Sequence, residues 1–387
     1  DGKVVGHVTA GEKQFATINT KIVIFPDKVY YDTEAEKFGM LAAEYPGFPG
    51  DVTFTANTLT VPEQSYIDQA AENAETKGSV AADTSITAYT GASVNKTTGA
   101  LTMSGGTAGT PDKLKAGDYI QYDCDSSKEY MVVQSSAKQS DGTYQITYLL
   151  HTAALHKYPG FDELFKAGDA IEISGCTTCA ANNGSHIIRS LEARKLTFTK
   201  DIFTKTGVEA GTVMLERKVP DLTCICECDN RIWGAEGKTI YASALGDPTN
   251  FYVYDGVSTD SYAVAVGTEG EFTGCIAYSS TVLFWKENCL HKVLGSYPAQ
   301  YEIYTYTVPG IQKGSEKSLA VINETLFYKG RNGVYAYSGG TPELLTENFG
   351  TRRFFDAVGG TDGERYYISM RTEKGDWELY VFDTLRA

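Results

Sequence analysis

Residues Asn230–Ser243 read NRIWGAEGKTIYAS, in which two apolar runs flank a short turn that contains glycine. Alternating apolar and polar residues on both sides of such a turn are typical of a β-hairpin. Three later stretches and one early stretch repeat the pattern. They are Ser279–Ser296 (SSTVLFWKENCLHKVLGS), Ile322–Gly340 (INETLFYKGRNGVYAYSGG), Asp362–Thr384 (DGERYYISMRTEKGDWELYVFDT) and Asn19–Thr33 (NTKIVIFPDKVYYDT).

The hairpins recur at a regular distance. With Trp233, Phe284, Phe327 and Tyr366 taken as equivalent anchors, the spacings are about 50, 43 and 39 residues, close to the roughly 40 to 50 residues of one propeller blade. A lone four-stranded blade leaves its faces poorly covered, and successive blades cover one another. The period therefore predicts an all-β fold, a β-propeller-like array of antiparallel blades.

The early hairpin lies about 200 residues before the next copy, so we expect an insertion, which a loop tolerates because its closure entropy grows slowly with length. The expected parts are the first propeller blade or blades in 1–61, an inserted small β-barrel or sandwich region in 62–220, and the remaining blades in 221–387.

Within the inserted region, Leu114–Asp123 (LKAGDYIQYD) is similar to Phe165–Ser174 (FKAGDAIEIS). In each, Gly-Asp predicts a turn into an alternating strand, and the second copy continues through the tight turn Asn183-Gly184. These signals indicate a small antiparallel barrel or sandwich, as one domain or as two small modules. Pro62–Lys77 is rich in Gln, Ala and Glu and predicts a short helix.

Composition supports this fold class. The chain of 387 residues has 26 Tyr, 17 Phe and 39 Gly against 5 Met, which favours strands and tight turns. A net charge of −15 without a Lys/Arg-rich run argues against a stable nucleic-acid surface. No apolar stretch approaches the ~18 residues of a membrane span, and the N-terminal residues lack the features of a signal peptide. Because the chain begins with Asp1 and ends just after a strand-like run, we expect it to be a piece of a longer protein.

Five of the eight cysteines are candidate metal ligands. Cys176 and Cys179 form a C-x-x-C pair, and Cys224, Cys226 and Cys228 form C-x-C-x-C. Four thiolates can hold a structural zinc ion. The alternative, which we favour, is that the three alternating cysteines share one face of a strand and pack as small apolar residues.

The sequence contains no recognisable catalytic arrangement. Propeller enzymes such as sialidases and glycoside hydrolases need two positioned carboxylates or a Tyr–Glu pair, whereas the 49 acidic residues here are scattered. The S-x-D-x-G-x-T-W box of sialidases, the G-x-S-x-G motif and phosphate-binding glycine loops are all missing, and the five His residues show no metal or triad spacing. We therefore expect no enzymatic activity and no cofactor.

The segment 230–295 resembles phage tail and head-to-tail connector proteins. The shared pieces are N-R-I-W-G, I-Y-A-S-A-L-G-D-P-T-N-F, and F-W-K-E-N followed by K-V-L-G. The segment AGDAIEISGCTTCAANNGSHIIRSLEARKLTFT is similar to small β-barrel modules of phage structural proteins. The nearest class is the podovirus tail hub or stabilisation protein, and the motifs are packing and turn features that carry no catalytic residues.

This resemblance implies a propeller with an inserted barrel, present in several copies around the tail axis below the portal. We therefore expect a non-catalytic structural component of the virion that forms a homo-oligomeric ring and contacts other tail or portal proteins. It would assemble in the cytoplasm of the host bacterium, with no membrane partner and with DNA only as passing cargo. The alternatives are a tail propeller that binds or cleaves host-surface carbohydrate, and a free-standing bacterial lectin.

Overall fold

A computed structural model describes residues 4–49, 52–61, 65–67, 75–82, 92–95, 100–103, 119–124, 127–138, 140, 144–151, 155–157, 159–199 and 201–384. The fold is all-β, as expected. In the described part the strands pair antiparallel except for one parallel pair, and the helices are one short α-helix, α1 (Phe161–Leu164), and four 3₁₀ helices of three residues each. Residues 1–60 with 161–387 form one compact unit, and 61–160 form a second. No helix among the described residues is both long and apolar enough to span a bilayer.

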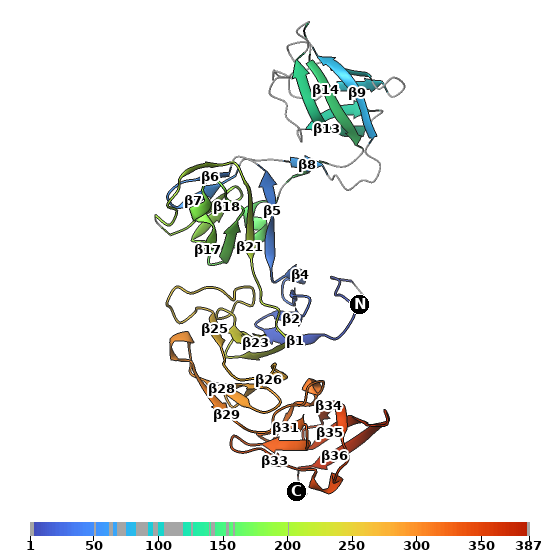
Figure 1. Ribbon diagram of the computed structural model, residues 1–387, viewed down its shortest axis with the longest axis vertical. Helices are drawn as coiled ribbons and strands as arrows, with labels where there is room; N and C mark the ends of the chain where they lie inside the picture. The colour runs from blue at the N-terminus through green and yellow to red at the C-terminus, as the bar shows by residue number, and fades with distance from the viewer. Residues whose placement is uncertain are drawn as a thin grey trace. The chain divides into compact units, whose positions relative to one another are not determined.

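Five sheets follow one another in the first unit, each with its strands paired in chain order (Figure 1). We call them sheets 1 to 5, together the array. Sheet 1 contains β1 (Gln14–Ile18), β2 (Lys21–Phe25), β3 (Val29–Asp32) and β4 (Lys37–Met40). Sheet 2 contains β22 (Cys224–Cys228), β23 (Arg231–Glu236), β24 (Thr239–Ala242) and β25 (Tyr262–Ala265). Sheet 3 contains β26 (Gly274–Tyr278), β27 (Thr281–Trp285), β28 (Leu290–Leu294) and β29 (Glu302–Tyr306). Sheet 4 contains β30 (Ala320–Ile322), β31 (Thr325–Gly330), β32 (Gly333–Tyr337) and β33 (Glu343–Leu344). Sheet 5 contains β34 (Phe354–Thr361), β35 (Arg365–Thr372) and β36 (Trp377–Asp383).

All five hairpins predicted from the sequence are confirmed as the second and third strands of these sheets. The turn before the hairpin is also repeated. In sheets 2, 3 and 4 the first two strands are joined by two residues with positive φ, a conformation that matches the twist of the flanking strands. These pairs are Asp229-Asn230, Ser279-Ser280 and Asn323-Glu324.

Alternation along each strand fills the space on both sides of a sheet. In β27, Val282 and Phe284 pack toward sheet 2, whereas Leu283 and Trp285 pack toward sheet 4. Each buried cluster of the array takes its residues from two successive sheets. Because each interior sheet is covered on both faces, its middle strands read as continuous apolar runs.

The anchor alignment was wrong by one residue at two sheets. Counted from the turn, the third residue of the second strand is Trp233 in sheet 2, Leu283 in sheet 3 and Phe327 in sheet 4. Phe284 instead faces Trp233 across the interface, with ring centroids 6.5 Å apart, and Tyr366 stacks on Phe327 at 5.1 Å. A shift of one residue places a side chain on the opposite face of a sheet. Phe284 and Tyr366 therefore contact the anchors of the preceding sheets, Trp233 and Phe327, and do not occupy positions equivalent to them.

Two further sheets form a module between sheets 1 and 2 in the sequence, which we call the two-sheet module. Its sheets have the orders β17-β16-β21-β5 and β18-β19-β7-β6-β20. Its strands are β5 (Ala43–Pro49), β6 (Val52–Phe54), β7 (Thr58–Thr60), β16 (Ala170–Ser174), β17 (Gly184–Ile187), β18 (Ser190–Glu192), β19 (Lys195–Thr197), β20 (Gly207–Glu209) and β21 (Thr212–Arg217). Three strands from the segment 1–61 thus pair with strands from 62–220, because pairing partners depend on tertiary packing and not on local alternation.

The second unit has a six-stranded sheet of order β11-β10-β12-β13-β14-β9 and a separate pair, β8 with β15. The bounds are β8 (Ser65–Ile67), β9 (Glu75–Ala82), β10 (Ala92–Asn95), β11 (Ala100–Met103), β12 (Tyr119–Cys124), β13 (Ser127–Lys138), β14 (Tyr144–His151) and β15 (Leu155–Lys157).

The helix predicted over Pro62–Lys77 is wrong where the structure describes that stretch, since β8 and the start of β9 occupy it; residues 62–64 and 68–74 lie outside the described residues. Pairing with β15 and β14 outweighs the local helix propensity there. The two similar Gly-Asp stretches lie in different units: the first leads into β12 and the second into β16.

Candidate functional site

The first strands of sheets 1, 2 and 3 meet at a cavity of about 740 Å³. Gln14 of β1 bridges two sheets there, donating to the Thr223 carbonyl at 2.7 Å and accepting from the Ile225 N–H at 2.9 Å. The wall also includes Phe25, Phe272 and Cys275. The first strands of the array therefore surround a shared space.

The lysines around this cavity are each paired with a carboxylate. Lys313 lies 2.6 Å from Glu271, and Lys317 lies 3.0 Å from Glu12. The second pair joins the start of sheet 1 to the segment before sheet 4. Because each lysine is neutralised by a carboxylate, the rim presents no concentrated positive field of the kind that binds phosphate groups.

A second cavity, of about 480 Å³, lies among loops of sheets 3, 4 and 5. Polar groups from Glu287, Asn288 and Asn332 line it together with the aromatic rings of Tyr335 and Phe355. A few convergent polar groups beside aromatic surface are the usual lining of a small-molecule site.

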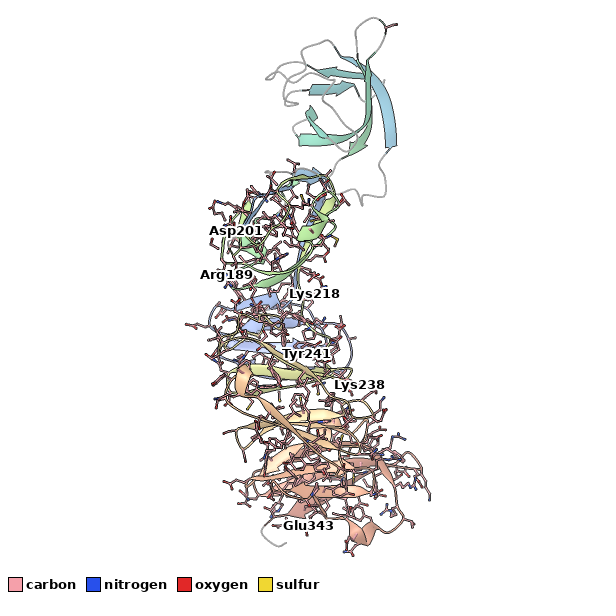
Figure 2. All side chains as sticks on the ribbon, turned by 60° about the vertical axis from the view of Figure 1, so that its left-hand side comes forward. Arg189, Asp201, Lys218, Lys238, Tyr241 and Glu343 are labelled. Atoms are coloured by element: carbon pink, nitrogen blue, oxygen red, sulfur yellow. The ribbon has the colours of Figure 1, made fainter. Side chains whose placement is uncertain are left out.

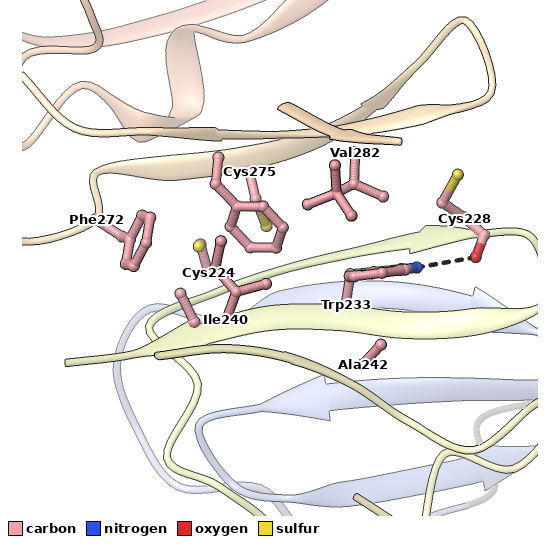
Figure 3. Packing of buried hydrophobic residues seen from close by; sticks show 11 residues of the cluster. Cys224, Cys228, Trp233, Ile240, Ala242, Phe272, Cys275 and Val282 are labelled. Carbon is pink, nitrogen blue, oxygen red and sulfur yellow. Dashed lines mark hydrogen bonds between the residues drawn. The ribbon is translucent and has the colours of Figure 1, made fainter. Parts of the chain in front are cut away.

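The structure places Cys224, Cys226 and Cys228 on one face of β22, as the packing interpretation predicted. Cys224 and Cys228 are buried in the cluster between sheets 2 and 3, and Cys226 packs against it. Figure 3 shows Cys224 and Cys275 between the two sheets, near Ile240 and Phe272. Burial raises the pKa of the Cys275 thiol well above its ordinary value and that of Cys228 to about 12. The Cys228 and Cys275 thiols are therefore protonated at neutral pH and behave as apolar side chains.

Cys176 and Cys179 lie instead in the two-sheet module, in a loop that follows β16. The loop surrounds the Glu209 carboxylate, which is fully buried and accepts bonds from the backbone N–H groups of Thr177, Thr178, Cys179 and Gly211 at 2.6 to 3.1 Å. Burial opposes ionisation of Glu209, but these donors outweigh it and lower its pKa to about 2.

The two cysteine groups are not joined into one site. Burial, followed by the Glu209 charge, raises the pKa of Cys176 to about 11 and also raises that of Cys179. In the part of the chain that the structure describes, no three His, Cys, Asp or Glu side chains are arranged to hold a metal ion.

Sequence reasoning missed a buried polar joint between the two-sheet module and sheet 2. Asp169, in the turn before β16, is fully buried and binds Arg217 of β21 through Oδ2. Its Oδ1 accepts from Asn250 Nδ2 at 2.9 Å, and Asn250 Oδ1 accepts from the Ala170 N–H at 3.2 Å. Arg217 also donates to the Leu41 carbonyl at 3.1 Å. We call Asp169, Arg217 and Asn250 the joint.

The S-A-L-G-D-P-T-N-F motif supplies one side of the joint. Asp247 accepts from Thr249 Oγ1 at 2.6 Å and from Asn250 Nδ2 at 2.7 Å, and its carboxylate lies 2.8 Å from Lys166 Nζ. These bonds hold the turn that presents Asn250 to Asp169. The sequence does contain a Gly-Asp turn at 168–169 and a D-P-T-N turn at 247–250. Neither pattern indicates that the two turns meet in the folded chain.

An exposed ion pair accompanies the joint. The Arg189 guanidinium of the two-sheet module (Figure 2) binds both carboxylate oxygens of Asp255, a loop residue of sheet 2, at 2.8 and 2.9 Å. Solvent reaches both side chains.

The N-R-I-W-G motif also has a structural role. Arg231 is buried and donates to the backbone carbonyls of Ser243, Ser258 and Asp260. It therefore closes the long loop between β24 and β25, the loop that carries Asn250. In the same motif, Trp233 Nε1 donates to the Cys228 carbonyl at 3.2 Å (Figure 3).

A buried histidine lies at the outer part of sheet 3. His291 makes hydrogen bonds of 2.9 Å with Thr268 Oγ1 and 2.8 Å with Thr305 Oγ1. Burial, and then the nearby Lys286 ammonium, lower the pKa of His291 to about 4. Both ring nitrogens are used within the fold, so this side chain is engaged in packing.

Comparison with known proteins finds no family model that matches the chain. No curated protein matches it either.

Proposed function

We propose that the chain is a non-catalytic structural component of a tailed bacteriophage virion, a tail hub or head-to-tail connector subunit that assembles with further copies around the tail axis. The observation that carries the proposal is the structural role of the two motifs that resemble connector proteins. Arg231 of N-R-I-W-G and Asn250 of D-P-T-N-F are buried in hydrogen bonds that fix a loop and its attachment to the two-sheet module. Residues that fix loops in this way make the chain rigid, as a subunit of a larger assembly needs to be.

The arrangement of the sheets supports a propeller-like interpretation. Successive sheets cover each other's apolar faces, and the first strands of sheets 1, 2 and 3 lie around one cavity, as the inner strands of blades do around a central channel. On this proposal sheets 1 to 5 are blades, and the two-sheet module is the inserted barrel or sandwich.

The net charge of −15 fits this role. A negatively charged wall repels the DNA backbone, so DNA passing along the tail axis would not adhere to it. On this proposal the partners are further copies of the chain and other tail or portal proteins, the subunits assemble in the cytoplasm of the host bacterium, and the finished protein resides in the virion.

Carbohydrate binding by a tail propeller is the second candidate, favoured by the polar and aromatic lining of the 480 Å³ cavity. Arg353 and Tyr335 both line this cavity. Glycan-array binding by the purified chain that Arg353→Ala and Tyr335→Phe weaken together would support this candidate. Val208→Ala, in β20 of the two-sheet module and not in the lining of this cavity, serves as the control.

The main proposal is tested on particles. Tailed-phage virions purified from the host that encodes the chain are analysed by quantitative mass spectrometry and by cryo-electron microscopy. We expect several copies per virion at the tail or the head-to-tail junction, and fewer in particles that carry Asp169→Ala, which destabilises the chain at the joint. Absence of the chain from wild-type particles would overturn the proposal.

A further inference from the structure

The second cavity, of about 480 Å³, is lined by turns and loops of three successive sheets. Glu287 and Asn288 lie in the turn between β27 and β28 of sheet 3, and Arg331 and Asn332 form the corresponding turn between β31 and β32 of sheet 4. Arg353 immediately precedes β34 of sheet 5. Each of these residues is therefore attached to a paired strand, which fixes the position of its backbone.

Two arginines of this cavity have no partner. Neither the Arg331 nor the Arg353 guanidinium makes a hydrogen bond or an ion pair with any residue that the structure describes. Every other arginine in the described ranges has at least one partner. Because the chain has 49 acidic residues against 34 Lys and Arg, carboxylates are in excess, and yet these two positive charges are not neutralised.

The first cavity differs in this respect. Its three lysines, Lys13, Lys313 and Lys317, each lie within 3.0 Å of a carboxylate oxygen. In the second cavity Glu287 is the one carboxylate among the lining residues, and it accepts from the Lys313 backbone N–H at 3.4 Å without forming an ion pair with either arginine. The second cavity therefore keeps a positive charge that the first one lacks.

A buried lysine beside the lining adds to this charge. Lys329 is 1% exposed, and its ammonium donates to Gln312 Oε1 at 2.8 Å and to the Gly330 carbonyl, with no carboxylate among its partners. Burial lowers the pKa of Lys329 to about 8, so the group is mostly charged at neutral pH. Gln312 lines the cavity, and because its carbonyl oxygen binds Lys329, its amide N–H groups are left to donate to a ligand.

The remaining lining suits a sugar ring. The amides of Asn288 and Asn332 and the hydroxyl of Thr307 can donate to and accept from sugar hydroxyls. The rings of Tyr335 and Phe355 provide apolar surface beside these polar groups. A volume of about 480 Å³ lies within the range of small-molecule sites.

We propose that the second cavity binds a saccharide that carries a carboxylate, and that the Arg331 and Arg353 guanidinium groups bind this carboxylate. A guanidinium presents its N–H donors in a planar fork that matches the two oxygens of a carboxylate. The inference rests on the second candidate function, carbohydrate binding at this cavity, and it names the class of saccharide.

The test uses the full purified chain. A glycan array with neutral oligosaccharides and with oligosaccharides that contain glucuronate, galacturonate or sialate identifies the acidic glycan that binds best. Titration calorimetry then compares this glycan with its carboxyl-reduced form, in which CH₂OH replaces each carboxylate, and with acetate and inorganic phosphate.

The variants are Arg331→Met and Arg353→Met, singly and together. The matched control is Arg189→Met, which also removes one positive charge but lies in the two-sheet module and not in the lining of this cavity. Both cavity arginines are exposed, so the variants should fold, and thermal unfolding verifies this. Each single variant is sufficient for the test if the double variant does not fold.

We expect wild type and the Arg189→Met control to bind the acidic glycan at least about tenfold more tightly than its carboxyl-reduced form, because hydrogen bonds to charged groups are the strong ones. Each cavity variant should bind the acidic glycan about tenfold more weakly than wild type does. The same variants should bind the carboxyl-reduced glycan as wild type does.

Equal binding of the acidic and carboxyl-reduced glycans would overturn the inference and leave carbohydrate binding in place, whereas a chain that binds no saccharide would overturn both. Acetate or phosphate bound as tightly as the acidic glycan would show a site for any small anion and would also overturn the inference. So would cavity variants that bind the acidic glycan as wild type does. All of these outcomes concern the isolated chain, so they are separate from its presence in virions.

Discussion

The interfaces between sheets and the joint to the two-sheet module are built from opposite chemistry. Between sheets 3 and 4, aromatic and aliphatic side chains such as Leu283, Trp285 and Tyr328 fill the space. At the joint, Asp169, Arg217 and Asn250 satisfy one another in a buried hydrogen-bonded set. Apolar packing loses stability gradually as volume is removed, whereas a buried charge network fails when one member is deleted. The interfaces between sheets should therefore tolerate substitutions better than the joint, whereas the joint requires its particular side chains.

The largest expected effect is at the joint. Asp169→Ala leaves the Arg217 guanidinium buried without its carboxylate, which we expect to lower the free energy of unfolding by about 3 to 5 kcal/mol. Urea denaturation measures the change. The double variant Asp169→Leu with Arg217→Met leaves no buried charge and should lose less than the single variant; a single variant within 1 kcal/mol of wild type would show that the joint is not a coupled unit.

Within the array, the contrast between covered and uncovered faces predicts the next effect. Leu283→Ala removes a fully buried side chain and should cost about 2 to 5 kcal/mol. Leu379→Ala, the same substitution at a position of β36 that is 66% exposed, should change the free energy of unfolding by no more than about 0.5 kcal/mol. Equal effects at the two positions would contradict the assignment of faces.

A pH-dependent effect is expected in sheet 3. The pKa of His291 is lowered from its ordinary value of 6.5 to about 4 by burial, so the unfolded chain binds a proton that the folded chain does not. The stabilising contribution is therefore complete above pH 6.5 and is lost as the pH falls from 6.5 through 4. His291→Gln keeps a hydrogen-bonding side chain without this titration. The difference in unfolding free energy between wild type and variant should slope over this range, and a flat difference would exclude His291 as the cause.

The smallest effect is expected at the exposed ion pair beside the joint. Arg189 and Asp255 are both reached by solvent, so Arg189→Ala should lower the free energy of unfolding by about 1 kcal/mol or less, and less still at high salt. Unfolding at low and high sodium chloride measures this. A loss as large as that of Asp169→Ala would mean that both pairs, and not the buried one alone, hold the module to sheet 2.

Local patterns were sufficient to predict the all-β class and all five hairpins of the array. Alternation and two-residue turns such as Asp229-Asn230 and Ser279-Ser280 act over a few neighbouring residues, so they can be read along one chain. The face on which Phe284 lies could not be read from them, because a shift of one position reverses the face and only packing against Trp233 determines it.

Pairings between distant segments depended on the tertiary structure. Asp169 and Arg217 are 48 positions apart, and Asp169 and Asn250 are 81 apart; each residue taken alone resembles an ordinary polar residue of a turn or strand end. Likewise, β5 pairs with β21 although all of residues 61–160 lie between these two strands in the sequence. Such contacts form only where the folded chain brings both partners into one buried place and removes water from them, so the hairpins follow from sequence, and the joint follows from three-dimensional packing.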